Sequence, residues 1–286
     1  MIIDGTKIAS NIYKDLQNKV GKLAEKNIVP HLAVILVGEN PASVAYVTLK
    51  QKKGEAIGAK ITLLRYDTSV ATAELLKKLV ELNNDPTVHG ILIQRPLPPQ
   101  IDVEKLELAT SPEKDIDGFH PDSPYTLPLP LAVVKILEEI YKIKTLDTPD
   151  TFRTWLASQV IVVLGKGPTG GGPIIKLLNK LGVNPTIIDS KTANPKDLML
   201  SADIIVASTG RENMVTPDAI KKGAILVGVG ILRGTAGKLK GDYDEEKIKD
   251  VAGFYTPTPG GVGPVNVAML MVNLLTATET QTNMLK

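Results

Sequence analysis

Residues 160–170 read VIVVLGKGPTG, an apolar run that passes directly into a glycine-rich turn. The run predicts a buried strand, and the residues after the turn have the pattern of a helix. Gly165, Gly167 and Gly170 match G-x-G-x-x-G, a spacing that permits a tight turn and close approach of the backbone to a pyrophosphate. The helix N-terminus would add N–H donors. The stretch therefore predicts a Rossmann-type dinucleotide-binding domain; a glycine-rich turn that binds nothing is the alternative.

The next predicted strand, Thr186–Ile188, ends at an acidic residue that bears on the choice of cofactor. Asp189 at this position is typical of an acceptor for the ribose 2′-hydroxyl of NAD. Lys166 and Ser190 are near in sequence and are suited to the 2′-phosphate of NADP. We predict NADP as the cofactor, with NAD as the open alternative.

The first half of the chain alternates apolar runs with helical patterns. Strands are expected at residues 31–37, 59–66 and 90–93, and helices at residues 41–57 and 73–84. This order predicts an α/β parallel sheet with right-handed crossovers. Ligands bind beyond the carboxyl ends of such strands. That rule marks two places, the helix that follows Val37 and the loop that begins at Gln94.

Tyr46 and Lys50 lie four residues apart in the first of these helices and so share one face. A lysine at the ligand-binding end of a sheet can have its pKa lowered by burial and act as a general acid or base. An ordinary amphipathic helix with a surface lysine explains the same spacing. Asp117, followed by Gly118, is either a ligand for N–H donors or part of a simple turn.

Composition limits the other classes of function. The 286 residues suffice for two domains, and a net charge of +2 gives no sign of a nucleic-acid-binding face. There are no cysteines, and the three histidines lack the spacing of metal ligands, so we expect no metal. The N-terminus has no signal pattern, and no uninterrupted apolar run approaches a membrane span. We expect a cytoplasmic protein without a membrane partner.

Four motifs, in this order, resemble the bifunctional methylenetetrahydrofolate dehydrogenase/methenyltetrahydrofolate cyclohydrolase family over nearly the whole chain. They are Tyr46–Lys50, Val88–Pro98, Pro112–Phe119 and Thr256–Pro264. The last, TPTPGGVGP, is the most specific. The resemblance implies two domains with the active-site cleft between them, tetrahydrofolate derivatives as substrates, and a homodimer built through the second domain.

The resemblance also implies roles for individual residues. Lys50 would be the general acid/base, Gln94 its hydrogen-bond partner that tunes it, and Tyr46 and Asp117 would orient and hold the folate. A substrate loop is implied at Pro259, Gly260 and Gly261. The cofactor residues would be Gly165, Lys166, Gly167, Gly170, Asp189, Ser190, Thr209, Gly230 and Ile231. The implied reactions are oxidation of 5,10-methylenetetrahydrofolate with NAD(P)+ and hydrolysis of the methenyl product to 10-formyltetrahydrofolate.

Three segments depart from the family pattern. They are Pro128–Leu131, where Pro-Cys-Thr-Pro is usual, Gly165–Gly167, where Gly-Arg-Ser is usual, and Gly228–Gly230, where Asp-Val-Gly is usual. These changes favour one alternative, a cyclohydrolase with weak dehydrogenase activity. A second alternative, from another class, is a non-catalytic dinucleotide-binding regulatory module. A shikimate-dehydrogenase-like enzyme would share the two-domain plan.

The predicted catalytic domain covers residues 1–140, with a C-terminal helix at 265–286 that packs back on it, and the nucleotide domain covers 141–264. A linker is expected near Thr148-Pro149-Asp150.

Overall fold

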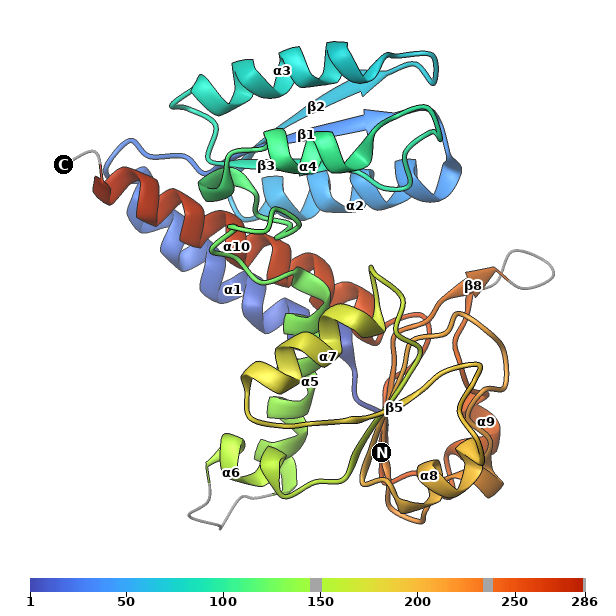
Figure 1. Ribbon diagram of the computed structural model, residues 1–286. Coiled ribbons are helices and arrows are strands. Elements are labelled where there is room, and N and C mark those ends of the chain that lie inside the picture. The colour runs from blue at the N-terminus through green and yellow to red at the C-terminus, as the bar shows by residue number, and fades with distance from the viewer. Residues whose placement is uncertain (145–150, 234–238, 285–286) are drawn as a thin grey trace. The chain divides into compact units, whose positions relative to one another are not determined.

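The computed structural model describes residues 1–144, 151–233 and 239–284 (Figure 1). The chain divides into two compact units. Ser10–Pro128 and Val267–Lys286 form one, here called the small-sheet unit; Met1–Ala9 and Leu129–Asn266 form the other, the large-sheet unit. The predicted linker at Thr148–Asp150 and the last two residues of the predicted C-terminal helix lie outside the described residues.

The small-sheet unit contains three parallel strands in the order β2-β1-β3. Its strands are β1 (His31–Val37), β2 (Lys60–Tyr66) and β3 (Gly90–Ile93), and its helical segments include α2 (Pro41–Ala56), α3 (Thr72–Asn84), α4 (Val103–Ala109) and the 3-10 turn η1 (Pro112–Lys114). The three strands and two long helices predicted for this half are confirmed to within two residues at each end.

The central strand β1 is buried on both faces, which explains its continuous apolar sequence. Leu32, Val34 and Leu36 pack in one core with α2, and the intervening residues of the strand pack in a second core with α3 and α4. This alternation follows from the two-residue period of a strand. The sheet is thereby held between two layers of helices (Figure 1).

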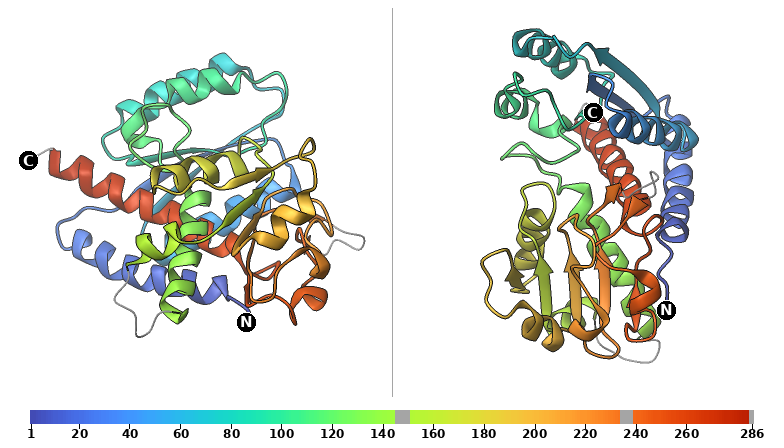
Figure 2. Two further views of the ribbon diagram at one scale, coloured as in Figure 1. Left: turned by 60° about the horizontal axis from the view of Figure 1, so that its bottom comes forward. Right: turned by 90° about the vertical axis from the view of Figure 1, so that its right-hand side faces the viewer.

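Two long helices complete the core beneath α2. They are α1 (Gly5–Ala24), which the sequence reading missed, and α10 (Val262–Met284). Leu16 and Val20 of α1 pack with Leu270 and Leu274 of α10, and the two helices run side by side (Figure 2). Residues 262–282 are long and apolar enough, by length and composition, to span a membrane, although Asn266 and Asn273 interrupt the apolar run. Because 67% of that window is buried inside the protein, α10 has the character of a core helix.

The large-sheet unit contains five parallel strands in the order β10-β7-β6-β4-β5. The strands are β4 (Ile161–Leu164), β5 (Thr186–Ile188), β6 (Ile204–Ala207), β7 (Ile225–Gly228) and β10 (Phe254–Tyr255), with a hairpin of β8 (Leu232–Arg233) and β9 (Leu239–Lys240). The helical segments are α5 (Pro128–Lys144), α6 (Phe152–Ala157), α7 (Gly171–Lys180), α8 (Pro195–Ser201), η2 (Pro217–Ala219) and α9 (Glu245–Ile248).

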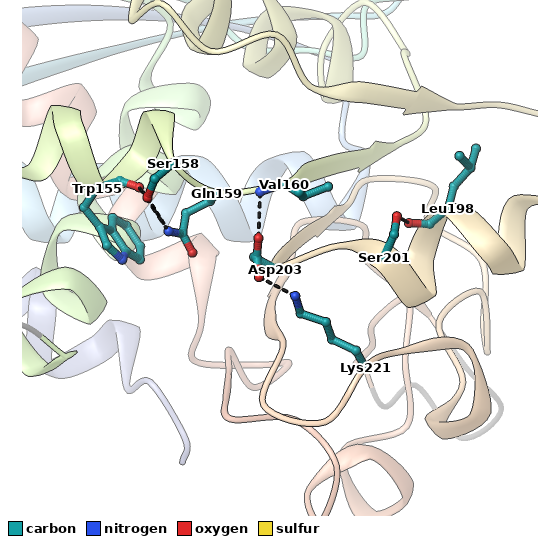
Figure 3. Close-up of polar contacts among 8 residues, drawn as sticks. All are labelled: Trp155, Ser158, Gln159, Val160, Leu198, Ser201, Asp203 and Lys221. Carbon is teal, nitrogen blue, oxygen red and sulfur yellow. Dashed lines mark hydrogen bonds and ion pairs between the residues drawn. The ribbon is translucent and has the colours of Figure 1, made fainter.

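The chain leaves β4 in one direction to form β5 and later returns to the other side of β4 to form β6. Such a reversal is the place where doubly wound sheets bind ligands. At the opposite ends of these strands, Asp203 accepts a hydrogen bond from the backbone N–H of Val160 at 2.8 Å and pairs with Lys221 (Figure 3). That contact ties the beginning of β4 to the beginning of β6.

The two compact units do not end where the predicted domains, 1–140 and 141–264, end. Helix α5 belongs to the large-sheet unit from Leu129 onward. The first residues of the chain also belong there, because the backbone N–H of Ile3 donates to the carbonyl of Tyr255 in β10 at 2.8 Å. Local sequence periodicity does not reveal such a long-range pairing.

Candidate functional site

Lys50 is placed by the junction between β1 and α2. Gly38 ends the strand with a φ of +75°, a left-handed conformation that favours glycine. Asn40 then caps α2, since its side-chain oxygen accepts hydrogen bonds from the backbone N–H groups of Ala42 and Ser43 at 3.0 and 3.2 Å. With Pro41 in the first turn, the helix begins at the carboxyl end of the sheet, as predicted.

Gln94 follows β3 directly and meets Lys50 across the sheet end. The Nζ of Lys50 donates to the Gln94 side-chain oxygen at 3.0 Å, and the Gln94 amide donates to the Arg95 carbonyl at 2.6 Å. Both residues are buried, with exposed fractions of 6% and 8%. The alternative of a surface lysine is therefore wrong.

Burial lowers the pKa of Lys50, and the nearby Asp117 carboxylate partly opposes that effect. A buried ammonium group loses its hydration. Compared with a lysine in water, the equilibrium between the two forms therefore shifts towards the neutral amine. The Gln94 oxygen accepts a hydrogen bond from the lysine, which orients the amine rather than lowering its pKa. The lowering that a base requires thus comes from the packing around Lys50.

Tyr46 lies one helical turn before Lys50, and its ring centroid is 4.7 Å from the lysine Nζ. The predicted shared face of α2 is confirmed by this contact. Val47, between them in sequence, points into the core instead and is 1% exposed. The tyrosine ring is half-buried, which leaves aromatic surface beside the amine.

Asp117 sits in a tight loop that Asp115 organises. The Asp115 carboxylate accepts hydrogen bonds from the backbone N–H groups of Gly118 and His120 at 3.2 and 2.7 Å, and Gly118 has a φ of +76°. The turn interpretation of Asp117 is confirmed, and the turn carries Asp117 to the wall of a pocket, the position that the ligand-facing alternative requires. Asp117 is partly exposed when the whole residue is counted, but its carboxyl group is surrounded by protein. Burial raises its pKa, and Lys50 and Arg95 oppose that rise.

Arg95 is a member of this site that the sequence reading missed. Its guanidinium pairs with the Glu107 carboxylate of α4 and lies over the ring of Phe119, 4.0 Å from the ring centroid. All three residues line the same pocket as Asp117. The available signal was position: Arg95 is the first residue after Gln94, within the loop that the sheet rule marks.

The glycine-rich turn follows β4 and leads into α7. Gly165 has a φ of +86°, and a Cβ there would lie 2.6 Å from the backbone oxygen of Ser208. A Cβ on Gly170 would meet the Ser208 hydroxyl at 2.5 Å, and one on Gly171 would meet the Gly165 carbonyl at 1.9 Å. Gly167 differs, because its Cβ would meet no atom within 4 Å. The protein itself therefore requires the outer glycines, and the open space at Gly167 fits the approach of a pyrophosphate.

Lys166 and Asp189 form an ion pair beside this turn, with 2.7 Å between Nζ and a carboxylate oxygen. The other carboxylate oxygen accepts from the Lys191 backbone N–H at 2.9 Å and from the Thr192 hydroxyl at 3.3 Å. The hydrogen bond from Lys166 is the main reason that the pKa of Asp189 falls to about 2. Ser190, the other predicted residue here, is exposed.

Asp242 connects the remaining predicted cofactor residues. This fully buried carboxylate accepts hydrogen bonds from the backbone N–H and hydroxyl of Thr209 at 3.1 and 2.5 Å, and from the Gly230 N–H at 2.9 Å. It thereby joins the loops after β6 and β7, next to Ile231, whose side chain is 53% exposed. The sequence reading missed Asp242, since in sequence it cannot be told from Asp244, which merely caps α9.

The segment Pro259–Gly261 belongs to the large-sheet unit, whereas Tyr46, Lys50, Gln94 and Asp117 belong to the small-sheet unit. Gly260 has a φ of +102°, and a Cβ on Gly261 would lie 2.5 Å from the Pro257 carbonyl. Helix α10 begins immediately afterwards at Val262, three residues earlier than predicted. Gly263 and Pro264 thus form its first turn rather than the end of a loop, because proline is well tolerated there.

Comparison with known proteins matches both halves of the chain to one protein family. Residues 3–117 match the family model described as tetrahydrofolate dehydrogenase/cyclohydrolase, catalytic domain, and residues 132–282 match its NAD(P)-binding domain. The bifunctional protein FolD of Paracidovorax citrulli is 40% identical over 288 residues, with 97% of each chain covered.

Solved structures agree with this match. The bifunctional FolD enzyme of Campylobacter jejuni has a TM-score of 0.90 and 34% identity, with 98% of this chain and 99% of that one covered. The Trypanosoma brucei dehydrogenase-cyclohydrolase, solved with an NADP cofactor and inhibitor, has a TM-score of 0.87 and 29% identity, with 99% and 98% covered.

Proposed function

Because this chain belongs to the tetrahydrofolate dehydrogenase/cyclohydrolase family, we propose that it is a bifunctional enzyme of one-carbon metabolism. It oxidises 5,10-methylenetetrahydrofolate with NAD(P)+ and hydrolyses the resulting 5,10-methenyl cation to 10-formyltetrahydrofolate. The observation that carries the proposal is the buried Lys50, hydrogen-bonded to Gln94 and adjacent to the Tyr46 ring.

Lys50 serves the hydrolytic step as the base. Water attacks the carbon between N5 and N10 of the methenyl cation, and neutral Nζ takes the proton that this water loses. The carbon–N5 bond then breaks, the hydroxyl of the adduct loses its proton as the carbonyl forms, N5 takes up a proton, and the formyl group stays on N10. The lowered pKa of Lys50 makes the neutral amine available nearer to neutral pH. Gln94 fixes the direction of the amine.

Tyr46 and Asp117 bind the substrate around this base. The half-buried Tyr46 ring offers a flat surface for the folate rings. Asp117 lines a pocket whose other walls include the apolar Ile91 and Leu97. A carboxylate in such surroundings is an acceptor for the N–H groups of a pterin.

The nicotinamide dinucleotide accepts the hydride in the oxidation when it is bound. Gly165, Gly167 and the N-terminus of α7 would hold its pyrophosphate, and the loops tied by Asp242 would complete the site.

NADP is the proposed cofactor. Lys166 and Lys191 place two positive charges against the one negative charge of Asp189, so the loop retains a net positive charge for a 2′-phosphate. Asp189 would accept the 2′-hydroxyl of NAD in its place. Asp189→Asn is expected to raise the ratio of NADP to NAD affinity, and Lys166→Ala to lower it, as read by calorimetric titration with each dinucleotide. Equal effects of both variants on the two cofactors would contradict this assignment.

A paired assay tests the function. Oxidation of methylenetetrahydrofolate is followed with NAD and NADP separately, and hydrolysis of methenyltetrahydrofolate is followed alone. Wild type should perform both, Lys50→Met should lose hydrolysis, and Lys52→Met, an exposed lysine on the same helix, should retain it. Absence of both reactions in wild type would overturn the proposal, and hydrolysis without oxidation would leave a cyclohydrolase only.

A homodimer formed through the large-sheet unit and a cytoplasmic location complete the proposal. β5 is an edge strand whose residue Ile187 is 41% exposed, a surface suited to a second copy. Sedimentation of wild type and Ile187→Lys tests the dimer, with a monomeric wild type as the contrary result. Cell fractionation tests the location.

A further inference from the structure

Two side chains hold the Arg95 guanidinium, which has no part in the proposed hydrolysis or hydride transfer. Glu107 on α4 pairs with it, and the ring of Phe119 lies under it with 4.0 Å to the ring centroid. The arginine side chain is 30% exposed and that of Glu107 is 25% exposed, so both are largely enclosed. Because Glu107 pairs with the guanidinium and the Phe119 ring lies against its plane, the guanidinium has a defined orientation.

The pocket that Arg95 lines is largely apolar, and its other charged residues are all acidic. Its lining includes the carboxylates of Glu107, Asp115 and Asp117, and Arg95 is the one cation among the residues that form its wall. Asp115 is committed to the backbone N–H groups of its own loop. Asp117 is therefore the carboxylate that can accept hydrogen bonds from a ligand. Burial raises its pKa, and the charges of Lys50 on α2 and of Arg95 in the loop after β3 both lower it.

Lys50 changes its charge during the proposed reaction, whereas Arg95 does not. A lysine that acts as a base must be neutral when it takes the proton, and at that moment it contributes no positive charge near Asp117. Arg95 stays protonated throughout, because a guanidinium is not deprotonated in proteins. Asp115 of the same loop is acidic, and its own pKa is raised first by burial and also by the charge of Asp117.

We propose, building on the function above, that Arg95 is a positioning residue whose fixed positive charge in the shared pocket keeps Asp117 ionised for the folate while Lys50 changes its charge. Glu107 and Phe119 hold Arg95 in place for this role. The inference assigns to the loop after β3 a second task beside that of Gln94.

The test compares Arg95→Leu, which removes the charge, with Arg95→Lys, which retains it without the fork. Arg95→Leu should raise KM for methenyltetrahydrofolate about tenfold at neutral pH. The increase should grow as the pH falls, because Asp117 then takes up a proton, while kcat stays within about twofold of wild type. Arg95→Lys should restore the pH profile of KM. A KM profile parallel to that of wild type in Arg95→Leu, or a loss of kcat without a change in KM, would overturn the proposal.

Two further measurements keep the test decisive. Glu107→Gln frees Arg95 without removing its charge, so it should raise KM less than Arg95→Leu and should not move the pH profile of KM to higher pH; it also serves if Arg95→Leu does not fold. Calorimetric titration with tetrahydrofolate from pH 6 to 8 reports binding without turnover. If wild type binds but turns over neither substrate, the proposed function fails while the role of Arg95 is still judged by the pH dependence of binding.

Discussion

The carboxyl ends of the two parallel sheets carry out different kinds of recognition. At the end of β1 and β3, charged and polar side chains are buried: Lys50 and Gln94 are 6% and 8% exposed. At the end of β4, by contrast, the turn is made of glycine backbone, and its charged residue Lys166 is 63% exposed in its side chain. The same strand–turn–helix plan thus supports both a reactive site and a binding cradle.

The difference lies in solvation. Burial changes the proton affinity of a charged group, and so it produces a base from Lys50. The pair of Lys166 with Asp189 has one exposed partner, the lysine, whose charge water screens, so the pair contributes little energy. We therefore expect the pair to affect the choice between NAD and NADP and not the rate of the chemical steps. The variants below test this comparison from its largest expected consequence to its smallest.

The largest effect is expected from matched substitution of the two lysines. Lys50→Met should reduce the hydrolysis rate by about 10³-fold, because the step loses its general base. Lys166→Met should weaken NADP binding by less than about tenfold, since an exposed charge is removed. Stopped-flow hydrolysis and calorimetric titration measure the two effects. Comparable losses from both lysines would break the comparison.

The next effect separates glycines that the fold requires from the one that the ligand requires. Gly165→Ala should destabilise the protein by about 3 kcal/mol, because a Cβ would strike the Ser208 backbone and the φ is positive. Gly167→Ala should leave stability within about 0.5 kcal/mol and weaken dinucleotide binding instead. Urea unfolding and cofactor titration distinguish them. Equal destabilisation by both would show that the space at Gly167 is not held for a ligand.

The smallest effect concerns the opposite end of the small sheet, where His31 begins β1 and His89 precedes β3. The ring of His89 accepts the backbone N–H of His31 at 3.2 Å, and the His31 ring contacts the Thr87 carbonyl at 3.0 Å and the Thr62 hydroxyl at 2.8 Å. Burial is the first cause that lowers the pKa of both histidines, followed for His31 by Lys60 and for His89 by His31.

Since both pKa values are lower in the folded state, the unfolded chain takes up protons first as the pH falls through the usual histidine range near 6.5. Stability should be complete above that range and decline on acidification, with a fall in Tm of a few degrees by pH 5. His89→Asn retains an acceptor for the His31 N–H without a titrating ring, so its Tm should decline less. An identical acid dependence in the two proteins would exclude the histidines as its source.

The strands and the residues that follow them were predictable because the signals are local. A continuous apolar run such as His31–Val37 is explained by burial on both faces, and the sheet rule then located Lys50 and Gln94 without any contact being known. Helix α1 was not predicted, although its apolar residues recur with helical periodicity. The start of α10 was predicted three residues too late, because Gly263 and Pro264 resemble loop residues in sequence. Arg95 and Asp242 were missed because their partners are distant in the chain.

The sequence by itself determined the alternation of strands and helices, the glycine turn after β4, and the positions of Lys50 on the helix after β1 and of Gln94 directly after β3. Those features depend on the periods of the two regular structures and on backbone conformations that only glycine adopts readily. Only the tertiary structure decided that Lys50 is buried, that Asp242 ties Thr209 to Gly230, and that Arg95 lies between Glu107 and Phe119. Burial and ion pairing arise from elements far apart in sequence, and so the chemistry of these side chains is set by packing.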